Sequence, residues 1–282
     1  MKGGGYAPRR PLPTLASQFS AGVVGASASG WRGVVVQKRQ SGAMPRAALL
    51  QWLRDGRDLS LRATMQAVRA VIFDMDGVLV LSGPAHWVAW QEAAAAHGRP
   101  LTHAEFLGFN GMTNQDICER LWGGRATPEF VAAIADRKER AYRDAVAAAV
   151  PLAPGCASLL TNLRAHGLQL AVGSSGPREN VDLVLDRGGI RAHFGAVVHA
   201  GLVARGKPAP DIFLRAAELL AVPPAHCVVV EDAPSGVRAA LAAGMRVLGL
   251  ATNHRPAELH DVGARLVLPD LAAVAVAHFA QA

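Results

Sequence analysis

A short apolar run that ends in two aspartates constrains this chain more than any other stretch. Residues 70–80 read AVIFDMDGVLV, so three apolar side chains precede Asp74 and Asp76. A β-branched and aromatic run bounded by turn residues predicts a buried strand of a parallel sheet. Both carboxylates then lie at the carboxyl end of that strand, where open α/β sheets bind ligands. In such a pair, one aspartate can attack as a nucleophile while the other donates or accepts a proton. A plain Asp-Met-Asp-Gly surface turn is the alternative. Gly77 allows the backbone to turn sharply and approach a ligand.

Strand and helix patterns alternate from Pro151 onward, which predicts a parallel α/β sheet. Four helical patterns without an intervening strand separate the first strand from Pro151, so they form an insertion. The expected strands after the first are 168–173, 196–199, 227–230, 246–250 and 265–268. The helices expected between these strands are 156–166, 177–187, 211–220 and 235–243, and the inserted helices are 85–97, one opening at Thr102 with Glu105 in a capping box, 113–121 and 127–150.

Residues 1–64 differ in composition from the rest of the chain. They contain ten Lys and Arg residues against two acidic ones, and they are rich in Gly, Pro and Ser. This composition predicts a disordered basic extension. It has three interpretations: a transit peptide, a basic arm for an anionic partner, or upstream sequence with Met65 as the true start, which we favour. The extension therefore carries a charge of +8 and the rest of the chain −1, which together give the net charge of +7, so the sequence does not indicate general nucleic-acid binding.

The three cysteines are widely spaced and lack a partner motif. Cys118, Cys156 and Cys227 form no CxxC pair and have no nearby His pattern. This spacing argues against a disulfide framework or a zinc site and indicates a reducing compartment. We therefore predict a cytoplasmic protein without a membrane span, or an organellar one if residues 1–64 are a transit peptide.

Three further segments place polar residues after strands or in a stiff loop. Ser174 and Ser175 follow one strand and precede a helix, which suits a phosphate, although a plain helix cap is the alternative. Lys207 lies in a Pro-rich loop, and a solvated surface lysine is the alternative there. Glu231 and Asp232 end another strand.

With the first aspartate pair, four acidic side chains are expected to share one edge of the sheet. Uncompensated, they would repel one another and raise one another's pKa values. A hard cation such as Mg²⁺ resolves this conflict and leaves positions for a phosphate oxygen and water. The sequence therefore predicts a metal-binding site there.

In this order, the four segments resemble the motifs of the haloacid dehalogenase-like (HAD) hydrolase superfamily. The resemblance covers about residues 65–268 and implies a Rossmann-like parallel sheet core, at 65–82 and 151–282, with an inserted mobile α-helical cap at 83–150. It implies that Asp74 is the nucleophile that forms an aspartyl-phosphate and that Asp76 is the general acid and base. Phosphate would be bound by Ser174, Ser175 and Lys207, and Mg²⁺ by Asp74, Asp76, Asp232 and Glu231. The carboxylate of Asp76 argues against a true dehalogenase, because such members lack one at that place.

The cap separates phosphatases from phosphomutases within this resemblance. Its layout is similar to that of β-phosphoglucomutase, which also has His and Trp at the places of His86 and Trp90. A core histidine beside Trp87 is the alternative for His86. Asn114 stands where the mutase has a phosphate-binding Arg, and Asp144 falls near a mutase Lys. Without these two cations, binding of a second phosphate, which a mutase requires, is disfavoured. Lys138, Arg140 and Arg143 nevertheless offer positive charge from neighbouring positions in the sequence.

These observations predict a Mg²⁺-dependent phosphatase of a small phosphorylated metabolite, a sugar or polyol phosphate. The same-class alternative is a sugar phosphomutase of the β-phosphoglucomutase type. A non-catalytic binding or regulatory protein ranks last, because a pure binder has no need of the second aspartate. We expect a small-molecule partner, no nucleic acid and no membrane, and a monomer or weak homodimer.

Overall fold

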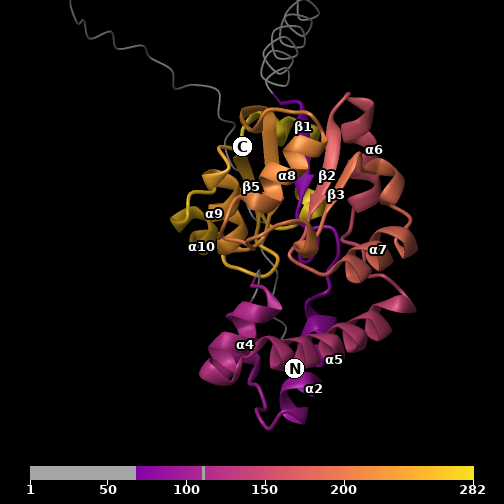
Figure 1. Ribbon diagram of the computed structural model, residues 1–282. Coiled ribbons are helices and arrows are strands. Elements are labelled where there is room, and N and C mark those ends of the chain that lie inside the picture. The colour runs from indigo at the N-terminus through magenta and orange to yellow at the C-terminus, as the bar shows by residue number, and fades with distance from the viewer. Residues whose placement is uncertain (1–67, 110–111) are drawn as a thin grey trace, which may run out of the picture. The chain divides into compact units, whose positions relative to one another are not determined.

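The computed structural model describes residues 68–109 and 112–282, so the predicted basic extension at 1–64 lies outside the described residues. A parallel sheet of six strands forms the centre of this part of the chain (Figure 1). Its strand order is β3 (Ala196–Val198), β2 (Gln169–Gly173), β1 (Ala70–Phe73), β4 (Cys227–Glu231), β5 (Arg246–Leu250) and β6 (Leu266–Leu268). The predicted α/β class and the predicted strands are confirmed.

Strand β1 lies between β2 and β4, and its register sets the geometry of the polar strand ends. Phe73 is paired with Val172 of β2 and with Val230 of β4. The next residue, Asp74, is therefore level with Glu231, and its backbone N–H donates to the Val230 carbonyl at 3.0 Å. The sheet thus brings the acidic ends of β1 and β4 side by side.

Alternate residues of β1 face two different helical layers, as the period of a strand requires. On one face, Val71 and Phe73 pack in an apolar cluster with residues of α6 (Cys156–Ala165) and α7 (Arg178–Arg187). Ala70 and Ile72 pack in the cluster on the opposite face. That face is covered by α8 (Asp211–Leu219), α9 (Pro234–Ala242) and α10 (Pro256–Asp261) (Figure 1). Helix α10 was not predicted, because six residues are too few to show a helical period.

In the described part of the chain, four α-helices lie between β1 and α6. They are α2 (Gly83–Ala96), α3 (His103–Leu107), α4 (Asn114–Trp122) and α5 (Pro128–Ala147). The predicted capping box of Thr102 and Glu105 opens α3, and Thr113 with Asp116 forms a second one at α4. These helices bury an apolar cluster of their own, which includes Trp90, Phe106, Ile117 and Ile134. The insertion therefore has a separate core, and we call it the cap below.

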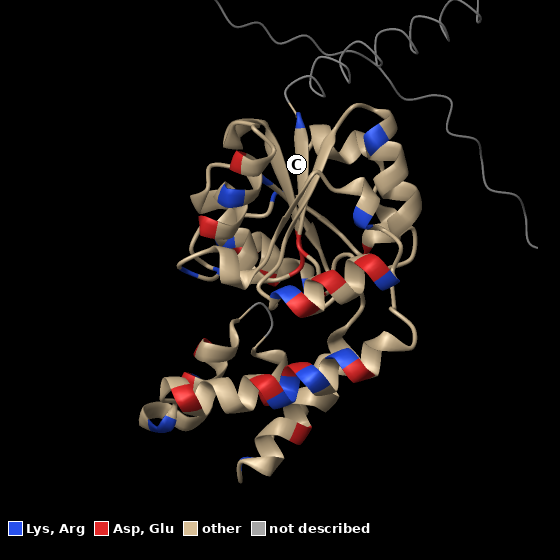
Figure 2. Cartoon of the chain, turned by 45° about the vertical axis from the view of Figure 1, so that its right-hand side comes forward, with Lys and Arg blue, Asp and Glu red and all other residues tan. Residues whose placement is uncertain are grey.

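Charged residues are interspersed along α5, the 20-residue helix of the cap (Figure 2). Among residues 68–109 and 112–282, the helices lack the combination of length and apolar character that a membrane span requires.

Candidate active site

The carboxyl ends of β1 and β4 form a buried ionic cluster around one lysine. Lys207 Nζ donates to Asp74 Oδ1 at 2.6 Å and to Glu231 Oε1 at 2.8 Å. Asp232 lies beside them, and each of the four side chains is buried. One lysine thus contacts two buried carboxylates, and a third lies beside them. This cluster, which we call the core end of the site, therefore has an excess of negative charge.

This excess is visible in the pKa values of the core end. Burial raises the pKa of Asp74 to about 7, although Lys207 opposes the rise. Burial and the neighbouring carboxylates Glu231 and Asp74 raise the pKa of Asp232 well above its usual value. The pKa of Lys207 is also raised, because these carboxylates outweigh the effect of its own burial. The repulsion expected from the sequence is therefore present at this edge of the sheet.

The same carboxylates are suited to hold a metal ion. Asp74, Glu231 and Asp232 each offer an oxygen within 4.8 Å of the others. Both oxygens of Glu231 are already engaged, since Oε1 accepts from Lys207 and Oε2 accepts from the backbone N–H groups of Asp232 and Ala233 at 2.6 and 2.8 Å. Buried carboxylate oxygens are ligands for a hard divalent cation. The donor set fits such an ion, with Asp74 and Asp232 better placed than Glu231 to contact it.

Gly77 lets the chain pass close to this cluster, as the sequence suggested. Its φ of +85° lies in the left-handed region, and an added Cβ would lie 2.1 Å from Asp232 Oδ2 and 2.4 Å from Asn253 Nδ2. Thr252 and Asn253, which follow β5, hold Gly77 and Asp232 together in this contact. Asn253 donates to Asp232 Oδ2, and Thr252 Oγ1 donates to the Gly77 carbonyl, both at 2.6 Å. Sequence reasoning missed Thr252 and Asn253, although they follow a predicted strand in the same way as the acidic pairs do.

The predicted phosphate-binding serines lie at the end of β2, beside β1. Ser174 is buried, and its Oγ accepts the Gly176 N–H at 3.0 Å. The Ser175 Oγ is buried and finds no hydrogen-bond partner among the described residues. An unpaired buried hydroxyl is costly, so this oxygen is available to a bound ligand. The roles of both serines toward phosphate remain predictions.

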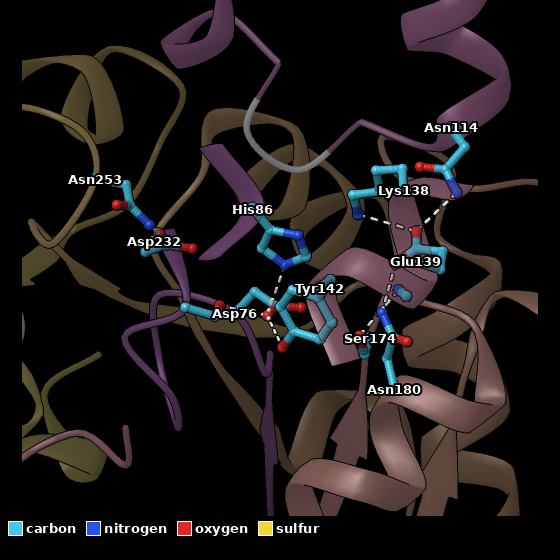
Figure 3. Close-up of polar contacts among 12 residues, drawn as sticks. Asp76, His86, Asn114, Lys138, Glu139, Tyr142, Ser174, Asn180, Asp232 and Asn253 are labelled. Atoms are coloured by element: carbon cyan, nitrogen blue, oxygen red, sulfur yellow. Dashed lines mark hydrogen bonds and ion pairs between the residues drawn. The ribbon is translucent and has the colours of Figure 1, made fainter. Parts of the chain in front are cut away.

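The side chain of Asp76 points toward the cap (Figure 3). Its Oδ1 accepts hydrogen bonds from Ser82 Oγ at 2.5 Å and Tyr142 Oη at 3.2 Å, and it lies 3.0 Å from His86 Nε2. Burial would raise its pKa, but the charge and hydrogen bond of His86 and the hydrogen bond of Ser82 lower it to about 2. Asp76 is therefore ionised in this arrangement and ready to accept a proton.

His86 contacts Asp76 rather than serving as a core residue beside Trp87. Its ring stacks on Tyr142 with 4.1 Å between ring centroids and 15° between planes. Trp87 instead packs against His103 and Phe106. Tyr142 was not singled out from the sequence, since a helical tyrosine without a motif gives no signal that it reaches the strand end.

A pocket lies between the strand ends and the cap. Its lining includes most of the predicted site residues, namely Asp74, Asp76, His86, Trp90, Asn114, Ser175, Lys207 and Asp232. Lys138, which the sequence offered only as an alternative source of charge, also lines it, as do Glu139 and Asn180, which were not predicted as site residues. Asp144, which was expected near a cation position, is exposed on α5. Of the three cations offered as alternatives, Lys138 lines the pocket, Arg143 contacts Asn180 from outside the lining, and Arg140 is exposed and paired with Asp136.

The comparisons with known proteins agree with this geometry. The family model of haloacid dehalogenase-like hydrolases matches residues 68–244. Hexitol phosphatase A of Escherichia coli is 34% identical over 209 residues, which is 74% of this chain and 94% of that protein. The crystal structure of β-phosphoglucomutase from Clostridium difficile superposes with a TM-score of 0.68 at 25% identity, and the match covers 76% of this chain and 96% of that one.

A longer plant protein is similar to this chain as well. The chloroplastic protein SUPPRESSOR OF QUENCHING 1 of Arabidopsis thaliana is 36% identical over 218 residues, which is 74% of this chain. The match spans 20% of that relative's length.

At the level of the family, the predicted class of HAD-like phosphoric monoester hydrolase is confirmed. On the match over residues 68–244, this chain belongs to the haloacid dehalogenase-like hydrolase family.

Proposed function

We propose that this protein is a Mg²⁺-dependent phosphatase that hydrolyses the monophosphate ester of a small sugar or polyol. The observation that carries the proposal is the core end, where a buried lysine holds Asp74 beside two further carboxylates. Hexitol phosphatase A among the relatives supports the same class of substrate.

In the first step, a carboxylate oxygen of Asp74 attacks phosphorus and forms an aspartyl-phosphate. The bond from phosphorus to the substrate oxygen breaks, and Asp76 donates a proton to the leaving alkoxide. In the second step, Asp76 takes a proton from water, whose oxygen attacks phosphorus and releases inorganic phosphate from Asp74. Because Asp76 is ionised in the contact with His86, it must gain a proton before the first step.

The remaining residues bind and orient the phosphoryl group. Lys207 and the hydroxyls of Ser174 and Ser175 would hold its oxygens and offset the charge that develops during transfer. Asp74 and Asp232 would hold Mg²⁺, with Glu231 fixing Lys207 behind them. When bound, Mg²⁺ supplies positive charge that offsets the carboxylates and the phosphoryl oxygens.

A sugar phosphomutase is the second candidate, favoured by the fold shared with β-phosphoglucomutase and by Lys138 in the cap. One experiment separates the two candidates. Phosphate release is measured with Mg²⁺ over a panel of sugar and polyol phosphates, beside an assay for isomerisation of β-glucose 1-phosphate. We expect release that is lost with EDTA. Isomerisation without net phosphate release would replace the proposal by the mutase.

The partner is then a phosphorylated small molecule, and we propose a monomer or weak homodimer that binds neither nucleic acid nor membrane. For location we keep the cytoplasm, with an organelle as the alternative, which the chloroplastic relative supports. Fractionation of cells that express the full chain, with mass spectrometry of its N-terminus, tests both the location and removal of residues 1–64.

A further inference from the structure

The cap end of the pocket contains a second buried ion pair, on adjacent residues of α5. Lys138 Nζ donates to Glu139 Oε1 at 2.9 Å, and both side chains are buried. Asn114 of α4 donates to the same oxygen at 2.8 Å. Asn180 of α7, a helix of the sheet domain, donates to Glu139 Oε2 at 2.6 Å. All four residues line the pocket, and Figure 3 shows them grouped on the side opposite Asp232.

The charges of this cap end are balanced. Among the described residues that line the pocket, the Lys and Arg side chains are Lys138 and Lys207 alone. Lys207 is taken up by Asp74 and Glu231 at the core end. Lys138 is paired with Glu139, and Arg143, whose Nη1 donates to Asn180 Oδ1 at 3.1 Å, lies outside the pocket lining, so the described lining of the cap end has no unpaired Lys or Arg side chain. A second phosphate placed there would meet the carboxylate of Glu139 and would have to compete for its lysine.

The pair is nevertheless equipped to bind hydroxyl groups. A carboxylate accepts about four hydrogen bonds. Three donors contact Glu139, which leaves room for a hydroxyl of a ligand. Burial would raise the pKa of Glu139, but Lys138 and Asn114 lower it below its usual value, so the acceptor stays ionised.

An apolar wall faces this polar pair. Trp90 and Phe106 line the pocket, and Lys138 Nζ lies 5.7 Å from the centroid of the Trp90 ring. Aromatic faces beside hydrogen-bonding groups suit a ligand that has both C–H surface and hydroxyls. A sugar or polyol carbon chain has this combination, whereas a second phosphate has not.

We propose that Asn114, Lys138, Glu139 and Asn180 form the subsite for the leaving group, that it selects an uncharged polyhydroxy group, and that Glu139 excludes substrates with a second phosphate. The inference rests on the proposed phosphatase function and narrows its substrate class to compounds with a single phosphate. Glu139 acts here as a specificity-determining residue, since it contacts the part of the substrate that does not react.

The test compares a hexitol 6-phosphate with fructose 1,6-bisphosphate for the wild type and for Glu139→Gln. The substitution keeps the shape of the side chain and removes the charge that neutralises Lys138. We expect the wild type to favour the monophosphate by at least about tenfold in kcat/KM, and Glu139→Gln to shrink that preference by about tenfold, mainly through KM.

Glu92→Gln is the matched control. Glu92 is an exposed carboxylate of the same cap, 3.2 Å from Arg137 Nη2, and Arg137 precedes Lys138 on α5. Its removal should leave the preference within about twofold of the wild type, because it lies outside the pocket. A similar shift in Glu92→Gln would overturn the assignment to Glu139, since any cap charge would then have the same effect.

Two results contradict the inference directly. One is a Glu139→Gln preference within about twofold of the wild-type value. The other is a wild type that hydrolyses the bisphosphate as efficiently as the monophosphate, which needs no variant and holds even if Glu139→Gln fails to fold. Hydrolysis of p-nitrophenyl phosphate is measured in parallel. If neither it nor any sugar phosphate is hydrolysed, the proposed function fails, and calorimetric titration of the same two compounds with Mg²⁺ still decides whether the subsite favours one phosphate.

Discussion

Both ends of the pocket are built around a buried lysine, yet they differ in charge. At the core end, Lys207 contacts Asp74 and Glu231, and Asp232 adds a third carboxylate. At the cap end, Lys138 contacts the single carboxylate of Glu139. The core end is thus short of positive charge, whereas the cap end is neutral.

This difference indicates what each end can receive. A site with unbalanced buried carboxylates is stabilised by a cation, since the alternative is to protonate them. The cap end has no such need, because its carboxylate is satisfied by one ammonium and the amides of Asn114 and Asn180. We therefore expect metal and phosphate to depend on the core end, and selection of the leaving group to depend on the cap end.

The largest effect is expected from Asp74→Asn, which removes the nucleophile while keeping its size. An amide does not form the aspartyl-phosphate, so kcat for phosphate release should fall by at least roughly 10⁴-fold. Steady-state phosphate release measures this, with circular dichroism as the control for folding. Turnover within about tenfold of the wild type would remove Asp74 from the role of nucleophile.

A comparison of Lys207→Met with Lys138→Met tests the difference in charge balance through stability. Without Lys207, two buried carboxylates lose their cation, and the free energy of unfolding should fall by about 3–5 kcal/mol. Without Lys138, Glu139 keeps two amide donors, so the loss should be smaller. Urea unfolding in EDTA measures both values. Equal losses would mean that the two ends do not differ in charge balance.

Addition of Mg²⁺ without substrate tests the same contrast by binding. A ligand that binds only the folded state, at a concentration about 100 times its Kd, raises the free energy of unfolding by about 2.7 kcal/mol. We expect this gain in the wild type and in Glu139→Gln, and its loss in Asp232→Asn. Thermal unfolding with and without Mg²⁺ measures it. A gain that disappears in Glu139→Gln but persists in Asp232→Asn would move the metal to the cap end.

The same contrast explains how far the sequence could predict the site. The residues of the core end follow strands in short motifs, and a parallel sheet necessarily gathers such strand ends at one edge. The sequence alone therefore sufficed to place Asp74, Glu231 and Asp232 together, and to predict the succession of strands and helices along the chain. The strand order of the sheet was also needed to find Asn253, because only the pairing of β4 with β5 brings it to Asp232.

The residues of the cap end lie on helices, where a single polar residue gives no comparable signal. Lys138 and Glu139 sit within a run of charged residues on α5, and most such runs face solvent. Which of these residues turn inward depends on how α5 packs on α2 and α7. Asn180 illustrates the limit, since its contact with Glu139 joins positions 41 residues apart. The sequence therefore predicted the chemistry more completely than the selectivity.

The smallest effects are expected from two asparagines that make equivalent hydrogen bonds at opposite ends. Asn253 donates to Asp232, and Asn180 donates to Glu139, both at 2.6 Å. Replacing either with Ala removes one hydrogen bond to a charged group, for which we take the low end of the usual range, about 1.5 kcal/mol, so each should change its own equilibrium by about tenfold. Asn253→Ala should raise the Kd for Mg²⁺ and leave the preference for a monophosphate unchanged, because Asp232 would lose a fixed orientation. Asn180→Ala should raise KM for the hexitol phosphate and leave the Kd for Mg²⁺ unchanged. If each variant moved both quantities, the two ends would act as one unit, and the division of the pocket into a metal end and a selecting end would be wrong.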